Sequence, residues 1–301
     1  MEKKSIVLAC RMDSERALDL TKRLFDFLIK KKNESVSLET RIAPKILPTS
    51  GRDLNDMTSE NTKFVLSIGG DGTLLRVAGG LNQHDPPPIL GVNIGSIGFL
   101  DESNERMIFK DINKILNGDF TVEKCSKISA CILRNKHDEK YLGDALNEVL
   151  IVSSKNSKVL QVSIKVNGVF INRSYLDGVI ISTSTGSTAY NLSAGGAIVH
   201  PSLNIMQIIP LNPYARSGLK PFILPIESDV EIQLLRPRLS ARILLDGRKI
   251  FKDIQPNTRI KISKSHSIVR FIRFNESYFR RIRKKIIGMI PVPRSDSPEE
   301  Y

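Results

Sequence analysis

Residues 64–80 read FVLSIGGDGTLLRVAGG, and the prediction of the fold rests on them. The apolar run Phe64–Ile68 predicts a buried strand, and the glycine-rich turn Gly69–Thr73 joins it to a segment, Leu74–Gly80, that can open a helix. Such a turn is a natural phosphate site, because its backbone N–H groups are accessible and the helix N-terminus favours negative charge. The phosphate-binding residues predicted here are Gly69, Gly70, Gly72 and Thr73.

Two familiar phosphate-binding motifs are absent from this turn. It lacks the Gly-Lys-Ser/Thr ending of a P-loop, and Leu75 replaces the third glycine of a dinucleotide-binding G-x-G-x-x-G motif. Asp71 lies among the glycines instead, where a carboxylate would repel phosphate unless something offsets the repulsion. It is therefore a candidate to hold a metal ion or to accept a proton in phosphoryl transfer. The alternative is an Asp that shapes the turn and caps the helix.

The sequence on either side of this stretch predicts an α/β N-terminal domain over residues 1–122. Its strands are expected at Ser5–Cys10, Phe64–Ile68 and Ile89–Asn93. A helix capped by Asp13 or Ser14 and a second helix over Asp101–Asn117 are expected, whereas Ala43–Thr62 stays unassigned. Strands that are apolar throughout and alternate with helices are typical of a parallel sheet covered on both faces.

A second glycine-rich turn, Gly91–Leu100, begins within the predicted strand Ile89–Asn93. Three glycines at this spacing let the backbone approach a ligand closely. Asn93 and Gly95 are therefore further candidates for phosphate binding, and the alternative is a plain loop between a strand and a helix.

From about residue 121 onward, short and closely spaced apolar runs predict a β-rich C-terminal domain over residues 123–270. The runs are Ile128–Leu133, Leu146–Val152, Val159–Val166, Val169–Ile171, Gly178–Ser182, Val230–Leu235, Ala241–Leu245, Ile250–Lys252 and Ile268–Phe274. Asn167-Gly168 lies between two of them and is a strong signal for a hairpin turn. The domain boundary is expected between Asp119 and Lys127.

The remaining residues, 271–301, are expected to pack back on the N-terminal domain and to end in a basic tail. Phe279, Ile282, Ile286 and Met289 recur at helical spacing within this segment. A helix packed on the chain's own first domain is preferred to a membrane-surface helix, because such stripes usually belong to a core.

The stretch Asp177–Pro201 is the richest in polar groups that could bind a nucleotide. Six of the seven residues from Ser182 to Thr188 are Ser or Thr, and a helix is expected to start near Thr188. Hydroxyls both donate and accept, which suits a nucleobase edge and ribose oxygens, and Tyr190 offers a flat apolar face with a polar tip. A turn that only caps a helix needs one hydroxyl, so capping does not account for the others.

Asn147-Glu148 is an adjacent polar pair inside a run of strand character. Neighbouring side chains of a strand point to opposite faces, so one of the two would face inward or lie at the end of the strand. Taken alone, the pair is interpreted as a solvated strand edge.

The composition is that of a globular protein, with 41% hydrophobic and 26% charged residues. No apolar run approaches the ~20 residues that span a bilayer, and the N-terminus lacks a signal-peptide pattern. The three cysteines, Cys10, Cys125 and Cys131, predict neither a disulfide framework nor a zinc site, which favours a reducing, cytoplasmic setting. The net charge of +13 favours polyanionic partners without choosing among nucleic acid, anionic lipid and nucleotides.

Three segments together resemble the NAD kinase family: Gly69–Thr73, Asn147-Glu148 and the run Asp177–Pro201. Lipid kinases of the diacylglycerol and sphingosine type share the first segment but not the third. The resemblance implies an α/β N-terminal domain with a parallel sheet and a β-rich C-terminal domain, with the active site between them. It also implies transfer of the terminal phosphoryl group of ATP to the 2′-hydroxyl of the adenosine ribose of NAD. The family uses Mg²⁺ or another divalent metal and forms homo-oligomers, which implies a dimer or tetramer here.

The resemblance assigns roles to individual residues. Asp71 is the implied proton acceptor for the target hydroxyl, and Asn147-Glu148 is implied to hold ribose and adenine groups of NAD. Asp246-Gly247 also falls on a family position but is interpreted as a hairpin turn. The implied NAD-binding residues are Asp71, Gly72, Arg76, Asn147, Glu148, Lys158, Tyr175, Asp177, Thr185, Thr188, Ala189, Tyr190, Asn191, Leu192 and Ser193. No metal ligand is identified beyond a possible share for Asp71.

Two other classes of protein stay open on the sequence alone. A lipid kinase with the shared glycine-rich turn would phosphorylate diacylglycerol or a sphingoid base. A nucleic-acid-binding protein would use the net charge of +13, but only 6% of residues are aromatic and Trp is absent, so stacking platforms are scarce. NAD and ATP are therefore the expected substrates, with no nucleic acid partner and no stable membrane association.

Overall fold

The structure, a computed structural model, describes residues 4–47, 51–95, 98–135, 138–155, 158–215, 218–274 and 278–286. The chain divides into two compact units. One unit comprises residues 1–123 and 270–301, and the other comprises residues 124–269. Each unit has its own core of buried apolar side chains.

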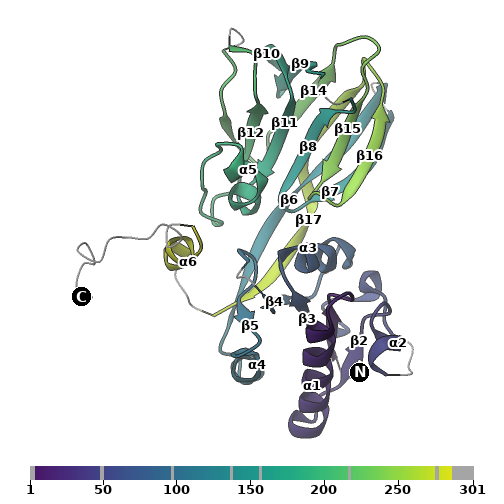
Figure 1. Cartoon of the computed structure of the whole chain (residues 1–301), viewed down its shortest axis with the longest axis vertical. Helices are drawn as coiled ribbons and strands as arrows, with labels where there is room; N and C mark the ends of the chain where they lie inside the picture. The colour runs from purple at the N-terminus through teal and green to yellow at the C-terminus, as the bar shows by residue number, and fades with distance from the viewer. Residues whose placement is uncertain are drawn as a thin grey trace, which may run out of the picture. The chain divides into compact units, whose positions relative to one another are not determined.

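A parallel sheet forms the centre of the first unit, in the order β2-β1-β3-β4 with β5 beside β4 (Figure 1). The strands are β1 (Ser5–Cys10), β2 (Val36–Leu38), β3 (Thr62–Gly69), β4 (Ile89–Asn93) and β5 (Ser103–Asn104). Every residue of β1 and β4 is buried, because a central parallel strand is covered on both faces. The predicted α/β domain with a parallel sheet is confirmed.

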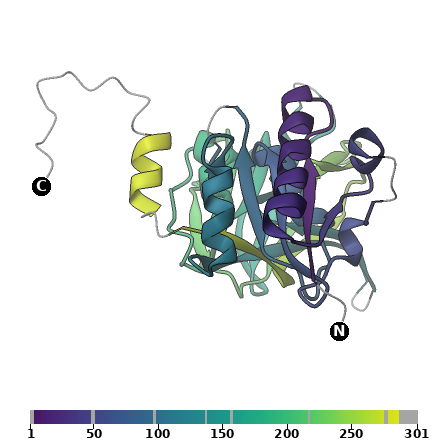
Figure 2. The same ribbon diagram turned by 90° about the horizontal axis from the view of Figure 1, so that it is seen from below.

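The helical elements described in this unit are α1 (Glu15–Lys32), α2 (Ala43–Ile46), the 3₁₀ turn η1 (Leu54–Asp56), α3 (Asp71–Gly80), α4 (Ile108–Leu116) and α6 (Tyr278–Lys285). Ser14 caps α1, as one of the two predicted residues, and its Oγ accepts a hydrogen bond from the Ala17 N–H at 3.3 Å. Figure 2 shows α1 and α4 side by side, and the rings of Phe27 and Phe109 meet edge to face with centroids 5.2 Å apart.

The helix predicted over Asp101–Asn117 is wrong in its first part. Ser103–Asn104 forms the short strand β5, which pairs with β4, and α4 begins only at Ile108. The Glu102 N–H donates to the carbonyl oxygen of Gly91 at 3.1 Å, so the chain is tied to β4 before the helix can start.

Two sheets form the second unit. One has the order β10-β9-β14-β17, with β6 beside β17 and β7 beside β6; the other, antiparallel throughout, has the order β13-β12-β11-β8-β15-β16 (Figure 1). The strands are β6 (Thr121–Asn135), β7 (Asp138–Ala145), β8 (Glu148–Ser153), β9 (Leu160–Val166), β10 (Val169–Leu176), β11 (Gly178–Thr183), β12 (Ile205–Leu211), β13 (Phe222–Pro225), β14 (Val230–Leu234), β15 (Ala241–Leu245), β16 (Lys249–Ile254) and β17 (Arg259–Arg273). The predicted β-rich character of this part of the chain is confirmed.

The hairpin predicted at Asn167-Gly168 is confirmed. Asn167 and Gly168 have φ angles of 51° and 79°, and the flanking residues Val166 and Val169 pair in an antiparallel ladder. Among the described strands of the second unit, β7, β12 and β13 were not predicted, and neither was the first half of β17, which alternates buried and more exposed residues.

The C-terminal segment forms α6 over Tyr278–Lys285. The basic residues predicted here, Arg280 to Lys285, are part of α6, whereas the part of the predicted helix that contains Met289, and the residues after it, lie outside the described residues. Within the described part of the chain, no helix combines the length and the apolar character that crossing a membrane requires.

Candidate active site

Asp71 is the first residue of α3 and directly follows Gly70 after β3. Its two carboxylate oxygens accept hydrogen bonds from the second glycine-rich turn: the Phe99 N–H donates to Oδ2 at 2.8 Å and the Leu100 N–H donates to Oδ1 at 3.1 Å. Gly70 occupies the N-cap position of α3, and Asp71 is the acidic residue of the first helical turn, so Asp71 is not the N-cap residue. Each carboxylate oxygen has a second lone pair, which suits it to accept a proton.

Three glycines of the two turns are not required by the fold of their own unit. A Cβ atom added to Gly70, Gly72 or Gly95 would meet no heavy atom within 4 Å among the described residues, and none of the three has a positive φ angle. By contrast, a Cβ atom on Gly69 would collide with the Thr73 side chain. Neither packing nor backbone conformation explains the first three glycines, whereas the close approach of a ligand to the backbone does.

This difference gives a first prediction, on Gly72. We expect Gly72→Ala to raise the free energy of unfolding by up to about 1 kcal/mol, because alanine stabilises a helix relative to glycine. We also expect a loss of about 10-fold or more in kcat/KM for ATP, because the new methyl group stands where a phosphate would approach the backbone.

The matched control for Gly72→Ala is Gly79→Ala. Gly79 lies in the same helix, is exposed, and has open space around its Cα atom among the described residues. This variant should show a similar gain in stability in thermal unfolding, with unchanged kinetics. Equal kcat/KM for ATP in the two variants would show that Gly72 does not lie at a phosphate-binding site.

Asn93 and Gly95 form the start of the second turn. The Gly95 N–H donates to Asn93 Oδ1 at 2.7 Å, and Asn93 Nδ2 donates to Asp101 Oδ2 at 2.9 Å. The Asn93 side chain is buried and shapes the turn, so the backbone of Gly95, rather than the Asn93 amide, is accessible to a ligand.

Arg76 lies one turn after Asp71 in α3 and is engaged in a buried ion pair. Its guanidinium contacts both carboxylate oxygens of Glu39, with Nη2 2.7 Å from Oε2, and also approaches the Cys10 carbonyl oxygen. Glu39 is 2% exposed and Arg76 15% exposed. The pair joins α3 to the edge of the sheet, a contact that the sequence patterns did not reveal.

Asn147 and Glu148 are buried, each 7% exposed, and the interpretation as a solvated strand edge is wrong. Glu148 begins β8, which lies between β11 and β15 in the centre of its sheet. Asn147 Oδ1 and Glu148 Oε2 are buried and have no hydrogen-bond partner among the described residues. Buried polar atoms almost always have a partner, so a water molecule or a polar ligand is expected beside these two oxygens.

Asp246 supports the Asn147-Glu148 segment, a role that the sequence reasoning missed. It occupies the predicted hairpin turn, with φ angles of 51° at Asp246 and 63° at Gly247, and this part of the interpretation is confirmed. In addition, its carboxylate accepts backbone N–H bonds from Leu146 at 2.9 Å, Asn147 at 2.7 Å and Glu148 at 3.2 Å. The Asp-Gly pair was the signal, but nothing local indicates that its side chain supports Asn147 and Glu148.

The hydroxyl-rich loop divides into structural and accessible groups. Four buried hydroxyls each donate to a backbone carbonyl: Ser182 to Asn147, Thr183 to Leu146, Ser184 to Leu203 and Ser187 to Val199. These four buried hydroxyls therefore hold the fold together. Thr185 and Thr188 are only partly buried, so a ligand could reach their hydroxyls, and Thr188 Oγ1 also donates to the nearby Thr185 carbonyl oxygen at 3.4 Å.

The same loop lies against Asn147 within the second unit. The Thr183 N–H donates to the Asn147 carbonyl oxygen at 2.9 Å, and a Cβ atom on Gly186 would collide with the backbone of Asn147. Gly186 is thus required by a close approach of two backbone segments. The structure brings these two sequence motifs together although about 35 residues separate them.

The helix expected to start near Thr188 begins at Tyr190 and is a single turn. Thr185–Thr188 forms the 3₁₀ turn η2, and α5 covers only Tyr190–Ser193. Tyr190 and Ser193 are exposed, Ala189 and Leu192 are partly buried, and Asn191 is fully buried. Asn191 Nδ2 donates to the Ser187 and Ala197 carbonyl oxygens at 3.2 and 3.3 Å, so this side chain holds the loop together.

Three further predicted NAD-binding residues lie at the surface of the second unit. Asp177 is exposed and accepts a hydrogen bond from Asn212 Nδ2 at 2.9 Å. Tyr175 on β10 is 46% exposed, and Lys158 is exposed just before β9. All three side chains are accessible to a ligand or to another protein chain.

Burial raises the pKa of the Glu148 carboxyl to about 7, with a further contribution from the Asp246 carboxylate. The usual value is 4.5, so the folded state holds the proton more tightly than the unfolded chain. The contribution of protonated Glu148 to the free energy of unfolding is therefore complete below about pH 4.5. It is lost as the pH rises through about 7.

This shift predicts that Glu148→Gln stabilises the chain at alkaline pH. At pH 8.5 the variant should exceed the parent by about 2–3 kcal/mol in free energy of unfolding, and the difference should vanish toward pH 4.5. Denaturant unfolding at several pH values measures it. Glu227→Gln, which changes an exposed carboxylate of the same unit, should give no such gain; a pH-independent difference for Glu148→Gln would contradict the shift.

The described residues offer no group of three or more His, Cys, Asp or Glu side chains placed to hold a metal ion. Mg²⁺ is usually held by one or two carboxylates together with substrate phosphates, and Asp71 within a glycine-rich turn fits that arrangement.

Comparisons with known proteins identify the family. Residues 6–120 match the family model of the ATP-NAD kinase N-terminal domain, and residues 146–274 match that of the ATP-NAD kinase C-terminal domain. An NAD kinase of Methanosarcina mazei is 31% identical over 284 residues, which cover 94% of this chain and 94% of that protein.

Two solved structures are similar in fold. An NAD kinase from Archaeoglobus fulgidus, in complex with ATP, superposes with a TM-score of 0.71 at 28% identity, covering 95% of this chain and 99% of that one. Yeast NADH kinase, complexed with NADH, gives a TM-score of 0.83 at 21% identity, covering 98% and 90% of the two chains. Both halves of the chain match one enzyme family and the fold agrees, so the chain belongs to the NAD kinase family.

Proposed function

We propose that this NAD kinase transfers the terminal phosphoryl group of ATP to the 2′-hydroxyl of the adenosine ribose of NAD. The observation that carries the proposal is the pair of buried oxygens, Asn147 Oδ1 and Glu148 Oε2, without a partner among the described residues. Their positions suit acceptors for ribose hydroxyls and the adenine amino group. The relatives support a dinucleotide acceptor, and the lipid-kinase alternative has no support from them.

Asp71 is proposed as the proton acceptor. A secondary hydroxyl is a weak nucleophile at neutral pH, so a positioned carboxylate assists by taking its proton as the new bond to phosphorus forms. The bond from the γ-phosphorus to the bridging oxygen of ADP breaks in the same transfer, and the products are NADP and ADP. The N–H groups of Phe99 and Leu100 hold the carboxylate in one orientation for this step.

The accessible groups of the second unit are proposed to bind NAD. Thr185 and Thr188 offer hydroxyls, Asp177 offers a carboxylate, and Tyr190 offers a ring that is 45% exposed. Their neighbours Ala189, Leu192 and Ser193 complete the proposed nucleoside site. Asp246 contributes indirectly, through the backbone of Asn147 and Glu148.

The glycine-rich turns are proposed to bind the phosphates of ATP. The open space at Gly70, Gly72 and Gly95 lets phosphate oxygens reach the backbone, and the first N–H groups of α3 have no acceptor within the helix. We propose that Mg²⁺ arrives with ATP, with at most Asp71 as a protein ligand, and that it neutralises charge on the phosphate oxygens.

We further propose a homo-oligomer, a dimer or a tetramer, in the cytoplasm. An apolar stretch of β10 supports association, since Val169 is 64% and Phe170 56% exposed. None of the three cysteines, all of which the structure describes, forms a disulfide, which accords with a reducing compartment.

A donor and acceptor panel tests the proposed function. The purified chain is mixed with Mg²⁺ and each pair of donor (ATP or polyphosphate) and acceptor (NAD, NADH, diacylglycerol or sphingosine vesicles), and products are separated by chromatography. We expect NADP from ATP and NAD. Phosphorylated lipid without NADP would overturn the proposal.

A further inference from the structure

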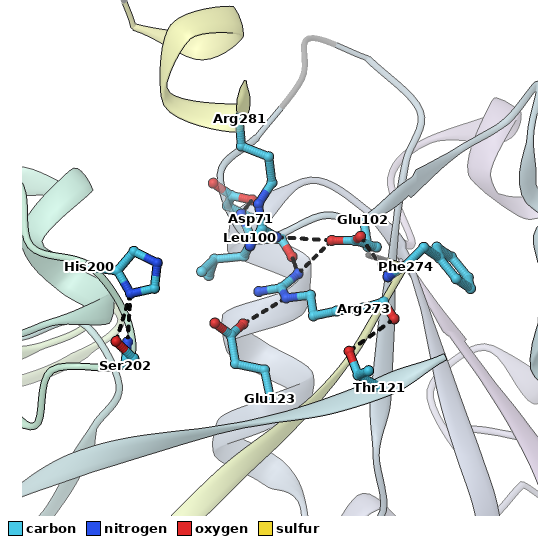
Figure 3. Close-up of polar contacts among 10 residues, drawn as sticks. All are labelled: Asp71, Leu100, Glu102, Thr121, Glu123, His200, Ser202, Arg273, Phe274 and Arg281. Atoms are coloured by element: carbon cyan, nitrogen blue, oxygen red, sulfur yellow. Dashed lines mark hydrogen bonds and ion pairs between the residues drawn. The ribbon is translucent and has the colours of Figure 1, made fainter. Parts of the chain in front are cut away.

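A network of charged side chains lies behind the Asp71 contact in the first unit (Figure 3). Arg273, at the end of β17, donates from Nη1 to the Leu100 carbonyl oxygen at 2.8 Å. Leu100 is the residue whose N–H donates to Asp71 Oδ1 at 3.1 Å. A single residue of the backbone therefore separates the Arg273 guanidinium from the carboxylate proposed to accept the proton.

Two carboxylates fix the guanidinium of Arg273. Its Nε donates to Glu123 Oε2 at 2.6 Å, and its Nη1 lies 3.2 Å from Glu102 Oε2. The side chain of Arg273 is 12% exposed and that of Glu102 is 3% exposed, so water screens these contacts weakly. Because the guanidinium is planar and its five N–H bonds point in fixed directions, contacts on two edges determine its orientation.

Glu102 connects the same network to the C-terminal helix. Its Oε1 accepts the Phe274 N–H at 2.9 Å, and its Oε2 lies 2.9 Å from Nη1 of Arg281 on α6. A buried carboxylate requires compensating charge, and Glu102 has two arginines. Glu102 therefore anchors the same nitrogen, Nη1, that donates to the Leu100 carbonyl oxygen, and Glu123 holds the Nε edge of the guanidinium.

We propose that Arg273 is a positioning residue for the phosphoryl transfer. It holds Leu100, so that the N–H groups of Phe99 and Leu100 keep the Asp71 carboxylate aimed at the substrate hydroxyl. Arg273 acts through Leu100, and it bears on the chemical step rather than on NAD binding. The inference rests on the proposed role of Asp71, and its physical basis is the steep dependence of transfer on geometry, where a misplacement of ~1 Å can cost about 100-fold.

The test compares Arg273→Gln with Arg270→Gln. Arg270 lies on the same strand, and its Nη1 contacts Asp85 Oδ1 at 3.1 Å and the Pro86 carbonyl oxygen at 2.9 Å. Each arginine thus bridges a carboxylate and a backbone carbonyl, but only Arg273 reaches a residue bound to Asp71. We expect Arg273→Gln to lower kcat about 10- to 100-fold with KM for NAD within about 3-fold, and Arg270→Gln to leave both within about 3-fold.

A double-variant cycle separates positioning from general destabilisation. If Arg273 acts only through Asp71, then Arg273→Gln should not lower further the residual kcat of Asp71→Asn. The same fold-loss in both backgrounds would overturn the proposal.

Thermal unfolding of the two arginine variants shows whether Arg273→Gln still folds. If it does not, Glu123→Gln takes its place, since it removes one of the two carboxylates that orient Arg273. It should lower kcat about 3- to 10-fold, and an unchanged kcat would overturn the proposal. A parent enzyme that forms no NADP would contradict the proposed function instead, so the two failures are distinguishable.

Discussion

Replacing Asp71 by Asn is expected to lower kcat for NADP formation by about 10²- to 10⁴-fold, the usual contribution of a positioned general base. The carboxamide keeps the shape of the side chain but cannot take the proton of the ribose hydroxyl. Affinity for NAD, measured by calorimetry, should change by less than about 10-fold, because the proposed contacts of NAD with Asn147 and Glu148 remain. Steady-state kinetics with a coupled NADP assay gives kcat and KM separately.

The structure also defines the control for Asp71→Asn. Asp85 is a carboxylate of the same unit that accepts a backbone N–H, from Ser59 at 2.9 Å, and it has no contact with Asp71 or with the two glycine-rich turns among the hydrogen bonds described. We expect Asp85→Asn to lower the free energy of unfolding by about 1–2 kcal/mol, as Asp71→Asn does, because each change removes an acceptor of backbone N–H groups. Unlike Asp71→Asn, it should leave kcat nearly unchanged. If Asp71→Asn retained more than about a tenth of the parent kcat, Asp71 would not be the proton acceptor.

The second large effect is expected at Asp246. Asp246→Asn keeps a residue type that tolerates the positive φ angle of 51° at this turn. One carboxamide oxygen can still accept from Asn147 and Glu148, but the amide group placed at the position of Oδ2 would face the Leu146 N–H, donor against donor. We expect a loss of about 2–4 kcal/mol in the free energy of unfolding and NAD binding about 10- to 100-fold weaker.

Asp144→Asn separates these two consequences of the Asp246 change. Asp144 is a carboxylate of the same unit that accepts hydrogen bonds from three serine hydroxyls, those of Ser129, Ser265 and Ser267, at 2.6 to 2.8 Å. Both variants should lose stability, whereas only Asp246→Asn should lose NAD affinity. Equal NAD affinity in the two variants would show that Asp246 serves the fold alone.

Much of the first unit could be predicted because its decisive patterns are local. The apolar strand Ser5–Cys10 and the turn around Asp71 are visible in a few consecutive residues, and the structure has both. The helix predicted from Asp101 was wrong at its start because Ser103 pairs with Val92 of a neighbouring strand. A pairing partner across the sheet leaves no trace in the local pattern.

The candidate site depended on tertiary contacts that the sequence does not record. Asn147-Glu148 has the local pattern of a strand edge, but the sheet order places Glu148 in the centre. Distant backbone carbonyls, such as that of Leu203, decide which of the six hydroxyls near Thr185 the fold uses. In physical terms, the identity of the polar groups was predictable, and their partners were not.

The resemblance to the NAD kinase family implied the reaction and its substrates, which composition and motif spacing alone did not. From the residues alone, the turn at Asp71 was equally compatible with a helix cap, and the +13 charge with several polyanions. The pair Asp246-Gly247 shows the limit of such reasoning, because its local role as a turn is real and conceals the three hydrogen bonds to the backbone of residues 146–148.

The most direct measurement is a crystal structure of the NAD complex, in which the distance from the Asp71 carboxylate to the ribose 2′-oxygen is determined. The proton-transfer account predicts a hydrogen bond of about 2.6–3.2 Å to the adenosine ribose, directly or through one water molecule. A carboxylate turned away from that hydroxyl, or a different part of NAD beside it, would contradict the account.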